Sequence, residues 1–462
     1  MNVQYFWYGT AYQMLLKIGT VYRTMKSEDI KRYIRLFHER DLPQVVKREL
    51  EPSLNKGKAT VIIGPRRSGK TYLLYSIVGD ERERYVYLNF ENPLLFGITG
   101  RDFPGVVDAY FDLYPENVGG EVFFLLDEIQ NVPNWEIGVR YLLDEDFMVA
   151  VTGSSSRLLS REVATQLRGR GISYTLLPLS FREFLRFRGV DFKKRDLYGR
   201  KVHVIKNLLD EYLRYGAFPE VALLGDKVRI LEEYLSVMIT KDVVERHGIR
   251  NVALIEALVK LLLSNYAKYT SYSSIHRFLK SEFGTSKTTV LEYLRALEDS
   301  FFVFFLPKFA RSEKESLRAP KKVYLIDTGL ALFSKKDPAR DIENAVFLEL
   351  LRRKHYLNPL LNIYYYGGSG EKEVDFVVSE SGKTVELIQV TLSLKDARER
   401  ELSAIVRAGK NLGCENLTVV TLEEEETIEM DGRRINVVPL WKFLLGLTPS
   451  APLSASPSPA PF

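Results

Sequence analysis

The sequence predicts an α/β protein with a phosphate-binding core of mostly parallel strands, followed by a helical part and a smaller α/β part. Two observations carry this prediction. A glycine-rich loop, GPRRSGKT at 64–71, lies between the apolar run 60–63 and the start of a helix. A second apolar run, 122–126, ends in the carboxylates Asp127 and Glu128. Strands that alternate with helices and carry ligand groups at their ends describe an open sheet with its site at the carboxyl edge.

Length and composition limit the number of domains and the class of protein. The 462 residues allow about three domains. A hydrophobic share of 45%, a charged share of 27% and an aromatic share of 12% are typical of a soluble globular protein. The net charge of +5 is mild, so any nucleic-acid argument must come from local clusters. The single cysteine, Cys414, excludes an intrachain disulfide and fits a cytoplasmic location.

Other classes of site and segment find no support in the sequence. The five histidines lack metal-ligand spacing, and no run approaches the ~18 apolar residues of a membrane span. Residues 1–27 lack the basic start and cleavage site of a signal peptide, so we expect a packed arm or an over-long gene start. Residues 448–462, rich in Pro, Ser and Ala, predict a disordered tail.

The loop at 64–71 fits the pattern G-x-x-x-x-G-K-[ST], in which backbone N–H groups converge on phosphate oxygens. Lys70 supplies a positive charge, and Thr71 supplies a hydroxyl for a hydrated magnesium ion. The other residues expected to line the cradle are Gly64, Pro65, Arg66, Arg67, Ser68 and Gly69. A chance glycine-rich turn is the alternative, and both flanks argue against it. The loop therefore predicts ATP and Mg²⁺ as ligands.

The carboxylates after the run 122–126 complete the expected chemistry. Asp127 can hold the water shell of magnesium, and Glu128 can orient and deprotonate the attacking water. An exposed acidic turn is the alternative interpretation. Asn89, at the end of a predicted strand over 85–90, is a candidate to hold Glu128 away from the water until a partner binds.

Three further side chains are candidates to act on the phosphates. Thr152 follows a predicted strand over 147–151 and is a candidate γ-phosphate sensor, with a helix cap as the alternative. Arg168 and Arg170 lie in a glycine-rich loop, and arginine suits a developing phosphoryl charge. They could serve the nucleotide of a neighbouring subunit in a homo-oligomer, or act in cis. A solvated basic loop is the other interpretation.

The order of the motifs resembles a known family. The segments that carry the resemblance are GPRRSGKT, FFLLDEIQNVPNWE, VAVTGSSSRLLS, LRGRG, LPLSFREFL, YGAFPEV and KDVVERHGI. They are similar to those of the prokaryotic, largely archaeal, AAA+ ATPases that carry a restriction-endonuclease-like C-terminal domain. The resemblance implies an AAA+ core at 28–185, a basic linker and helical lid at 186–250, a winged helix at 251–320 and a nuclease-like domain at 321–447.

Residues 254–310 read as helix, short helix, helix and aromatic hairpin, which is a helix-turn-helix order with a wing. The turn falls at Gly284, and the wing would run from 301 to Arg311. The nucleic-acid candidates on the second helix are Lys287, Thr288, Thr289 and Arg295. Winged helices also contact proteins, so DNA and a protein partner both stay open.

Restriction-type nucleases place a carboxylate on a helix, an Asp on one strand and Glu-x-Lys on the next, because magnesium needs convergent carboxylates. Glu343 and Asp375 match the first two positions. Gln389 and Thr391 stand where the acid and the lysine are required. We interpret the site as degenerate and the domain as a binding module.

Together these patterns predict an AAA+ ATPase whose nucleotide state moves the lid, the winged helix and an inactive nuclease-like domain, with DNA as the expected partner and no membrane contact. The alternative is a nucleotide-switched protein-interaction scaffold that does not bind nucleic acid. An ATP-dependent nuclease is disfavoured by Gln389 and Thr391.

Overall fold

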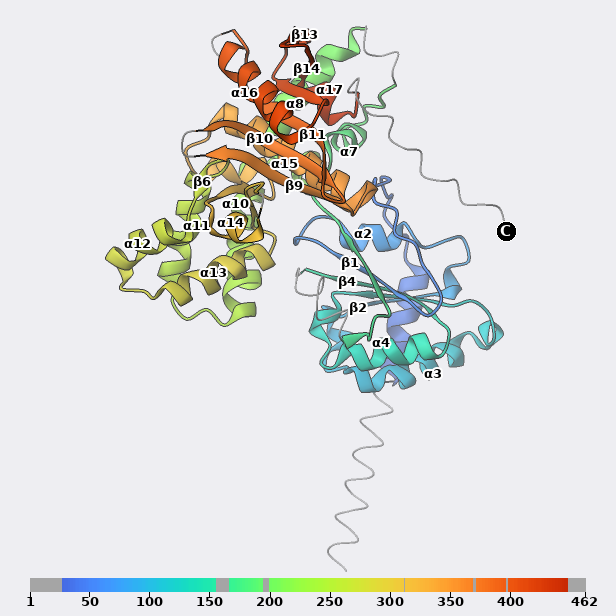
Figure 1. Cartoon of the computed structure of the whole chain (residues 1–462). Helices are drawn as coiled ribbons and strands as arrows, with labels where there is room; N and C mark the ends of the chain where they lie inside the picture. The colour runs from blue at the N-terminus through green and yellow to red at the C-terminus, as the bar shows by residue number, and fades with distance from the viewer. Residues whose placement is uncertain are drawn as a thin grey trace, which may run out of the picture. The chain divides into compact units, whose positions relative to one another are not determined.

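The computed structural model describes residues 27–154, 166–193, 199–310, 312–368, 371–395 and 398–447. The predicted N-terminal arm up to residue 26, the predicted tail and Arg311 lie outside the described residues. Contacts divide the chain into two units, 1–64 with 69–176 and 65–68 with 177–462 (Figure 1). Within the described ranges, no helix combines the length and apolarity that a membrane crossing requires.

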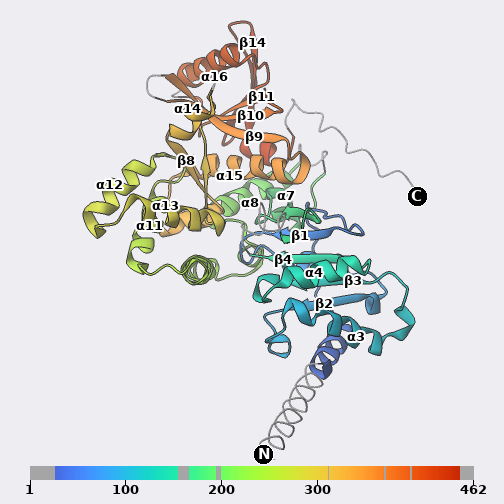
Figure 2. The same cartoon turned by 60° about the horizontal axis from the view of Figure 1, so that its bottom comes forward.

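The first unit is built on a five-stranded parallel sheet with the order β2-β3-β4-β1-β5. Its strands are β1 (Ala59–Ile63), β2 (Tyr85–Asn89), β3 (Phe123–Asp127), β4 (Met148–Gly153) and β5 (Gly171–Thr175). Figure 2 shows β1, β4, β3 and β2 side by side. Every residue of β1 is buried, as expected for a parallel strand covered on both faces. The predicted α/β fold with a parallel core is therefore confirmed.

Helices and short 3-10 turns connect these strands. The helices are α2 (Lys70–Tyr75), α3 (Phe103–Leu113) and α4 (Trp135–Asp144), and the turns are η1 (Arg82–Arg84), η2 (Pro93–Leu95), η3 (Gly100–Asp102), η4 (Pro115–Asn117) and η5 (Ile129–Asn131). Close packing of α3 on α4 depends on Gly138, because a Cβ there would lie 2.5 Å from the ring of Phe103. The apolar spacing at 27–51 predicts one helix that ends before Pro52, whereas the helix of the structure covers only 27–39.

The second unit begins with helices. They are α7 (Phe181–Phe187), α8 (Lys201–Tyr215), α9 (Pro219–Leu223), α10 (Lys227–Val237) and the π-helical η7 (Met238–Glu245). The turn between α8 and α9 centres on Gly216, whose φ is 77°. A Cβ at Gly216 would lie 1.6 Å from Asp327 Oδ1, so the turn requires glycine.

A group of three longer helices and one short helix follows, together with a small antiparallel sheet. Its helices are α11 (Val252–Ser264), α12 (Tyr272–Phe283), α13 (Lys287–Asp299) and the short α14 (Glu313–Arg318). The sheet has the order β6-β8-β7, with β6 (Tyr269–Thr270), β7 (Val303–Leu306) and β8 (Lys321–Leu325). The domain boundary that we predicted at residue 320 therefore separates two strands that pair. The long connection between β7 and β8 also runs along the next sheet, since Phe309 N donates to Tyr365 O.

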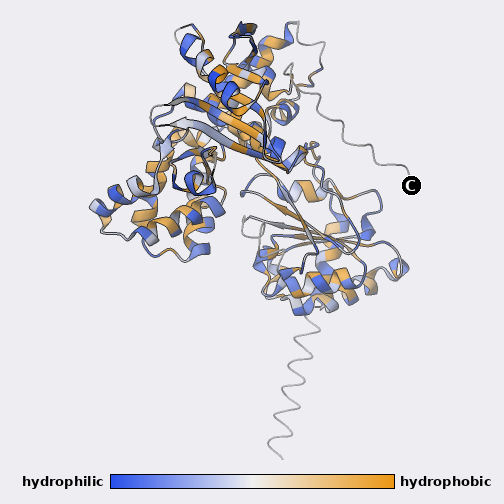
Figure 3. Cartoon of the chain, in the orientation of Figure 1, coloured by the Kyte–Doolittle hydropathy of each residue, from blue (hydrophilic) through white to orange (hydrophobic). Residues whose placement is uncertain are grey.

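The last part is a six-stranded mixed sheet with the order β13-β14-β12-β11-β10-β9. The strands are β9 (Leu361–Gly368), β10 (Glu371–Glu380), β11 (Lys383–Val390), β12 (Leu417–Thr421), β13 (Glu426–Met430) and β14 (Arg433–Pro439). The helical segments are η8 (Thr328–Phe333), α15 (Pro338–Arg352), η9 (Arg353–Leu357), α16 (Arg398–Leu412) and α17 (Leu440–Leu444). Apolar residues of α16, β10–β12 and β14 form one buried cluster, including Leu402, Ile405 and Val419. Figure 3 shows hydrophobic segments along the strands of this sheet.

Candidate functional site

The phosphate loop follows β1 directly, and α2 begins at its lysine. Arg67 and Gly69 have φ values of 65° and 95°, the left-handed conformations that turn the chain into the helix. Lys70 is buried, and its Nζ donates to the backbone oxygen of Gly64 at 3.2 Å. The loop thus bends back over the lysine, as a cradle for phosphate oxygens requires.

Asp127, at the carboxyl end of β3, accepts hydrogen bonds from three hydroxyls. Thr71 Oγ1 donates at 2.7 Å, Tyr87 Oη donates at 2.9 Å, and Thr152 Oγ1 also donates. Burial raises the pKa of Asp127, while the donors from Thr152 and Thr71 act in the opposite direction. Thr71 and Asp127 bring two hard oxygens together, and this donor set fits the water shell of Mg²⁺. No pattern in the sequence indicates the contact of Tyr87 with Asp127, which arises because β2 pairs with β3.

Glu128 is the first residue after β3 and has a φ of 55°. Its Oε1 lies 3.8 Å from Lys70 Nζ, and its Oε2 accepts a 2.5 Å hydrogen bond from Gln130 Nε2. The expected role of Asn89 in holding Glu128 stays a prediction. Asn89 Oδ1 accepts from Glu91 N at 2.9 Å, the local turn that asparagine favours at a strand end.

Thr152 joins the two carboxylate residues. Its hydroxyl donates to Asp127 Oδ1 and accepts from the backbone N–H of Glu128 at 2.9 Å. The hydroxyl therefore orients both residues at the end of the sheet. Its expected role in sensing the γ-phosphate stays a prediction, and the helix that it would alternatively cap falls largely within 155–165, outside the described residues.

Arg168 and Arg170 precede β5, so they lie at the amino ends of the parallel strands, whereas the phosphate loop lies at the carboxyl ends. Ala59, the first residue of β1, pairs with the first residue of β5 and donates through its N–H to Arg170 O at 2.7 Å. The phosphate loop begins at the other end of β1, and five strand residues span about 16 Å. Arg170 forms an exposed ion pair with Asp144. The structure therefore does not bring these arginines to the phosphate loop of their own chain.

Two side chains of the phosphate loop are engaged within the second unit, with which residues 65–68 group. Arg66 Nε lies 3.1 Å from Oδ1 of the buried Asp242, which also pairs with Arg246 at 3.2 Å. The guanidinium of Arg67 lies over the ring of Tyr234, 5.5 Å from its centroid. Tyr234 lies on α10, Asp242 lies on η7, and Arg246 directly follows η7. Both helices fall in the segment that we predicted as the lid.

The nucleic-acid candidates on α13 divide into two groups. Lys287, Thr288 and Arg295 are exposed. Thr289 is half-buried, and its Oγ1 lies 2.9 Å from Oγ of the helix cap Ser286. Lys287 and Arg295 are therefore available for phosphate contacts, whereas Thr289 supports the start of the helix.

The structure brings Glu343 and Asp375 of the nuclease-like pattern together around the ammonium of Lys322. Gln389 lies behind Asp375: its Oε1 accepts from Asp375 N at 3.3 Å, and its Nε2 donates to Glu401 at 2.7 Å. Thr391 Oγ1 instead donates to Ser393 O at 3.1 Å. The sequence pattern did not identify Lys322, because nothing in its neighbourhood marks it as a partner of α15 or β10.

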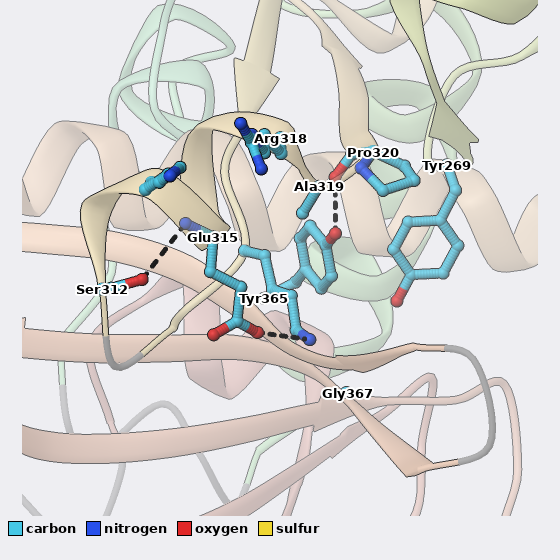
Figure 4. A pocket seen from close by; sticks show the side chains of 10 residues that line it. Tyr269, Ser312, Glu315, Arg318, Ala319, Pro320, Tyr365 and Gly367 are labelled. Atoms are coloured by element: carbon cyan, nitrogen blue, oxygen red, sulfur yellow. Dashed lines mark hydrogen bonds and ion pairs between the residues drawn. The ribbon is translucent and has the colours of Figure 1, made fainter.

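A pocket of about 660 Å³ lies between α14 and β9 (Figure 4). Its lining includes charged and aromatic side chains, namely Tyr269, Lys308, Lys314, Glu315, Arg318 and Tyr365. Lys308 Nζ pairs with Glu315 Oε1 at 3.2 Å. Lys314 and Arg318 are exposed, so the pocket carries positive charge beside two tyrosine rings.

Comparison with known proteins finds three family models that match successive parts of the chain. Residues 56–185 match the AAA domain family, 206–339 match a domain of unknown function, DUF8612, and 341–443 match another, DUF4143. An uncharacterized protein of Haemophilus influenzae is 29% identical over 396 residues, which is 82% of this chain and 93% of that protein. The Aeropyrum pernix ORC1 protein, solved in complex with DNA, aligns over 60% of this chain and 85% of that chain with 13% identity and a TM-score of 0.28, a likeness too low to carry an argument.

Uncharacterized protein MJ1544 of Methanocaldococcus jannaschii is 38% identical over 418 residues, and the alignment covers 87% of this chain and 91% of that protein. Identity of this extent over nearly the whole of both chains shows common family membership. The chain therefore belongs to the family of MJ1544 and carries an AAA domain at its phosphate loop.

Proposed function

We propose that the chain is a magnesium-dependent ATPase of the AAA+ type that couples hydrolysis to movement of its C-terminal parts on DNA. The observation that carries the ATPase proposal is the convergence of Lys70, Thr71, Asp127 and Glu128 at one end of a parallel sheet. This set contains a phosphate-binding cation, two oxygen donors for a metal water shell and a carboxylate base.

Each side chain has a distinct part in the proposed hydrolysis. Lys70 neutralises the β- and γ-phosphates, which draws its ammonium away from Glu128. Thr71 and Asp127 would hold Mg²⁺, which supplies charge neutralisation at the phosphates. Glu128 accepts a proton from the attacking water, and this role requires its release from Gln130.

The coupling proposal is supported by Arg66 and Arg67, which are part of the phosphate loop by sequence. Arg66 contacts the buried Asp242, and Arg67 contacts Tyr234. A change of loop conformation on ATP binding would alter these contacts and so bias the position of the helices that carry them.

DNA is the proposed partner because α11–α13 with β6–β8 have the order of a winged helix, and α13 exposes Lys287 and Arg295. The pocket beside α14 adds exposed cations at Lys314 and Arg318. The rival function, a nucleotide-switched scaffold for a protein partner, uses the same surfaces without phosphate contacts.

A salt-dependent titration tests the DNA proposal. Binding of a fluorescent random duplex should weaken steeply with salt, and Lys287→Ala/Arg295→Ala should lower the slope of log K against log salt by about 2, since each lost phosphate contact removes about 0.9. Arg407→Ala/Arg434→Ala removes the same charge from exposed positions on α16 and β14 and should leave the slope unchanged. Absence of duplex binding at low salt, with ATP hydrolysis intact, would favour the scaffold.

A further inference from the structure

The carboxylate cluster of the nuclease-like part contains a cation from its own chain. Lys322, on β8, is 2% exposed. Its Nζ lies 2.6 Å from Glu373 Oε1, 2.8 Å from Asp375 Oδ1 and 3.0 Å from Glu343 Oε1. An ammonium has three N–H donors, so the three carboxylates match its full hydrogen-bonding capacity.

The three acids come from separate parts of the fold. Glu343 lies on α15, while Glu373 and Asp375 lie two residues apart on β10, so that both can face the same side of the strand. Convergence of carboxylates from different elements on one point is the arrangement by which proteins hold divalent cations. Here that point is occupied by Nζ, which lies within hydrogen-bond distance of all three carboxylates.

Neighbouring groups hold this arrangement in place. Tyr324 Oη donates to Glu343 Oε1 at 2.6 Å, and Val390 N donates to Asp375 Oδ2 at 2.8 Å. The ring of Tyr269 lies 5.3 Å from Lys322 Nζ. Across the described ranges, no group of three acidic, histidine or cysteine side chains is arranged to hold a metal ion. The residues of the expected nuclease site therefore do not fit a metal.

We propose that the Lys322 ammonium is the resident cation of the Glu343, Glu373 and Asp375 cluster and closes it to divalent metal. Entry of a metal would require the buried ammonium to leave three carboxylate partners, of which Asp375 is itself buried, and breaking a buried ion pair is strongly unfavourable. The nuclease-like part then remains a metal-independent module, and β8 is tied by charge to α15 and β10.

The test compares Mn²⁺ binding by the parent chain with Mn²⁺ binding by its variants, using the full chain without nucleotide. Binding is measured from the electron paramagnetic resonance signal of free Mn²⁺. Lys322→Met removes the ammonium and keeps a long side chain. The variant should bind one more Mn²⁺ per chain than the parent, and Mn²⁺ should raise its Tm. Both effects should vanish in Lys322→Met/Asp375→Asn. Lys395→Met, at an exposed position, is the matched control and should behave as the parent.

Any of three results would overturn the proposal. The first is a folded Lys322→Met chain, verified by circular dichroism, that binds no additional Mn²⁺. The second is Mn²⁺ binding by the parent chain that Asp375→Asn abolishes, and this result decides the question even if Lys322→Met does not fold. The parent should also leave plasmid DNA uncut with Mg²⁺ or Mn²⁺. Cleavage lost in Asp375→Ala would show an active metal site. None of these readouts depends on ATP hydrolysis.

Discussion

Gln130 Nε2 donates a 2.5 Å hydrogen bond to Glu128 Oε2, so the proposed catalytic base is held by a residue two positions further along the chain. Gln130→Ala should free this carboxylate and raise the basal ATPase rate about fivefold, equivalent to about 1 kcal/mol of a charge-assisted hydrogen bond. The measurement is steady-state phosphate release with and without DNA. Stimulation by DNA should shrink in the variant.

The neighbouring Asn131→Ala is the control for Gln130, because Asn131 is exposed. It should leave the basal rate unchanged. A fall in rate for Gln130→Ala, with unaltered ATP affinity, would show instead that Gln130 positions Glu128 for catalysis.

Lys70 and Glu128 should separate ATP binding from turnover. Lys70→Ala removes the buried cation of the phosphate loop and should abolish tight binding of a fluorescent ATP analogue. Glu128→Gln keeps the shape of the side chain and should retain binding while lowering turnover by about 10² or more. Hydrolysis by Glu128→Gln at the parental rate would exclude this carboxylate as the base.

Arg168 and Arg170 begin one strand length away from their own phosphate loop, so a role in hydrolysis requires a neighbouring chain. Mixing Arg168→Ala/Arg170→Ala chains with Lys70→Ala chains should restore part of the ATPase activity, because each chain supplies what the other lacks. Mixed assembly is verified by capture through a tag on one chain.

Glu128→Gln mixed with Lys70→Ala is the matched control for this complementation. Both lesions fall in the same nucleotide site, so no activity should return. If the arginine pair likewise gives no recovery at any ratio, the ion pair of Arg170 with Asp144 has only a structural role.

Stability should depend on pH through Asp327. Burial raises the pKa of Asp327 to about 6, although the N–H groups of Ala217 and Gly329 act in the opposite direction. Because the folded state binds the proton of the Asp327 carboxyl more tightly than the unfolded state does, protonation stabilises the fold. This contribution to the free energy of unfolding is complete below the ordinary pKa of 3.8 and is lost as pH rises through the folded-state pKa of about 6. Between pH 4 and 7 the parent should lose about 3 kcal/mol relative to Asp327→Asn.

Thermal unfolding at several pH values measures this difference. The Tm of Asp327→Asn should rise relative to the Tm of the parent as the pH increases. Glu232→Gln changes an exposed carboxyl and should follow the parent. A constant gap from pH 4 to 7 would show that Asp327 is ionised throughout.

Local pattern was sufficient to predict the phosphate loop and the parallel core. Apolar runs flank the loop at 64–71 and precede Asp127, and parallel strands place such motifs at one edge of a sheet. The edge strand β5 was missed, because its residues are largely half-exposed and follow a glycine-rich loop.

Contacts between distant residues were beyond sequence reasoning. Lys322 bonds to Asp375, 53 positions away, and Tyr87 bonds to Asp127, 40 positions away. No periodicity or spacing encodes such a pair. Gln130 was missed for another reason: it is near Glu128, but glutamine in a loop has no preferred partner, and only the backbone turn after β3 directs it to the carboxylate.

The position of Lys322 determines where this chain can be divided for expression. The border between the matches to DUF8612 and DUF4143 falls at residues 339–341, in the first turn of α15. A fragment that starts there would carry the carboxylates of Glu343, Glu373 and Asp375 without their ammonium, and β9 without the paired connection at 307–309. Recombinant C-terminal fragments should therefore begin ahead of β6. The border between the two sequence families is not a border between folding units.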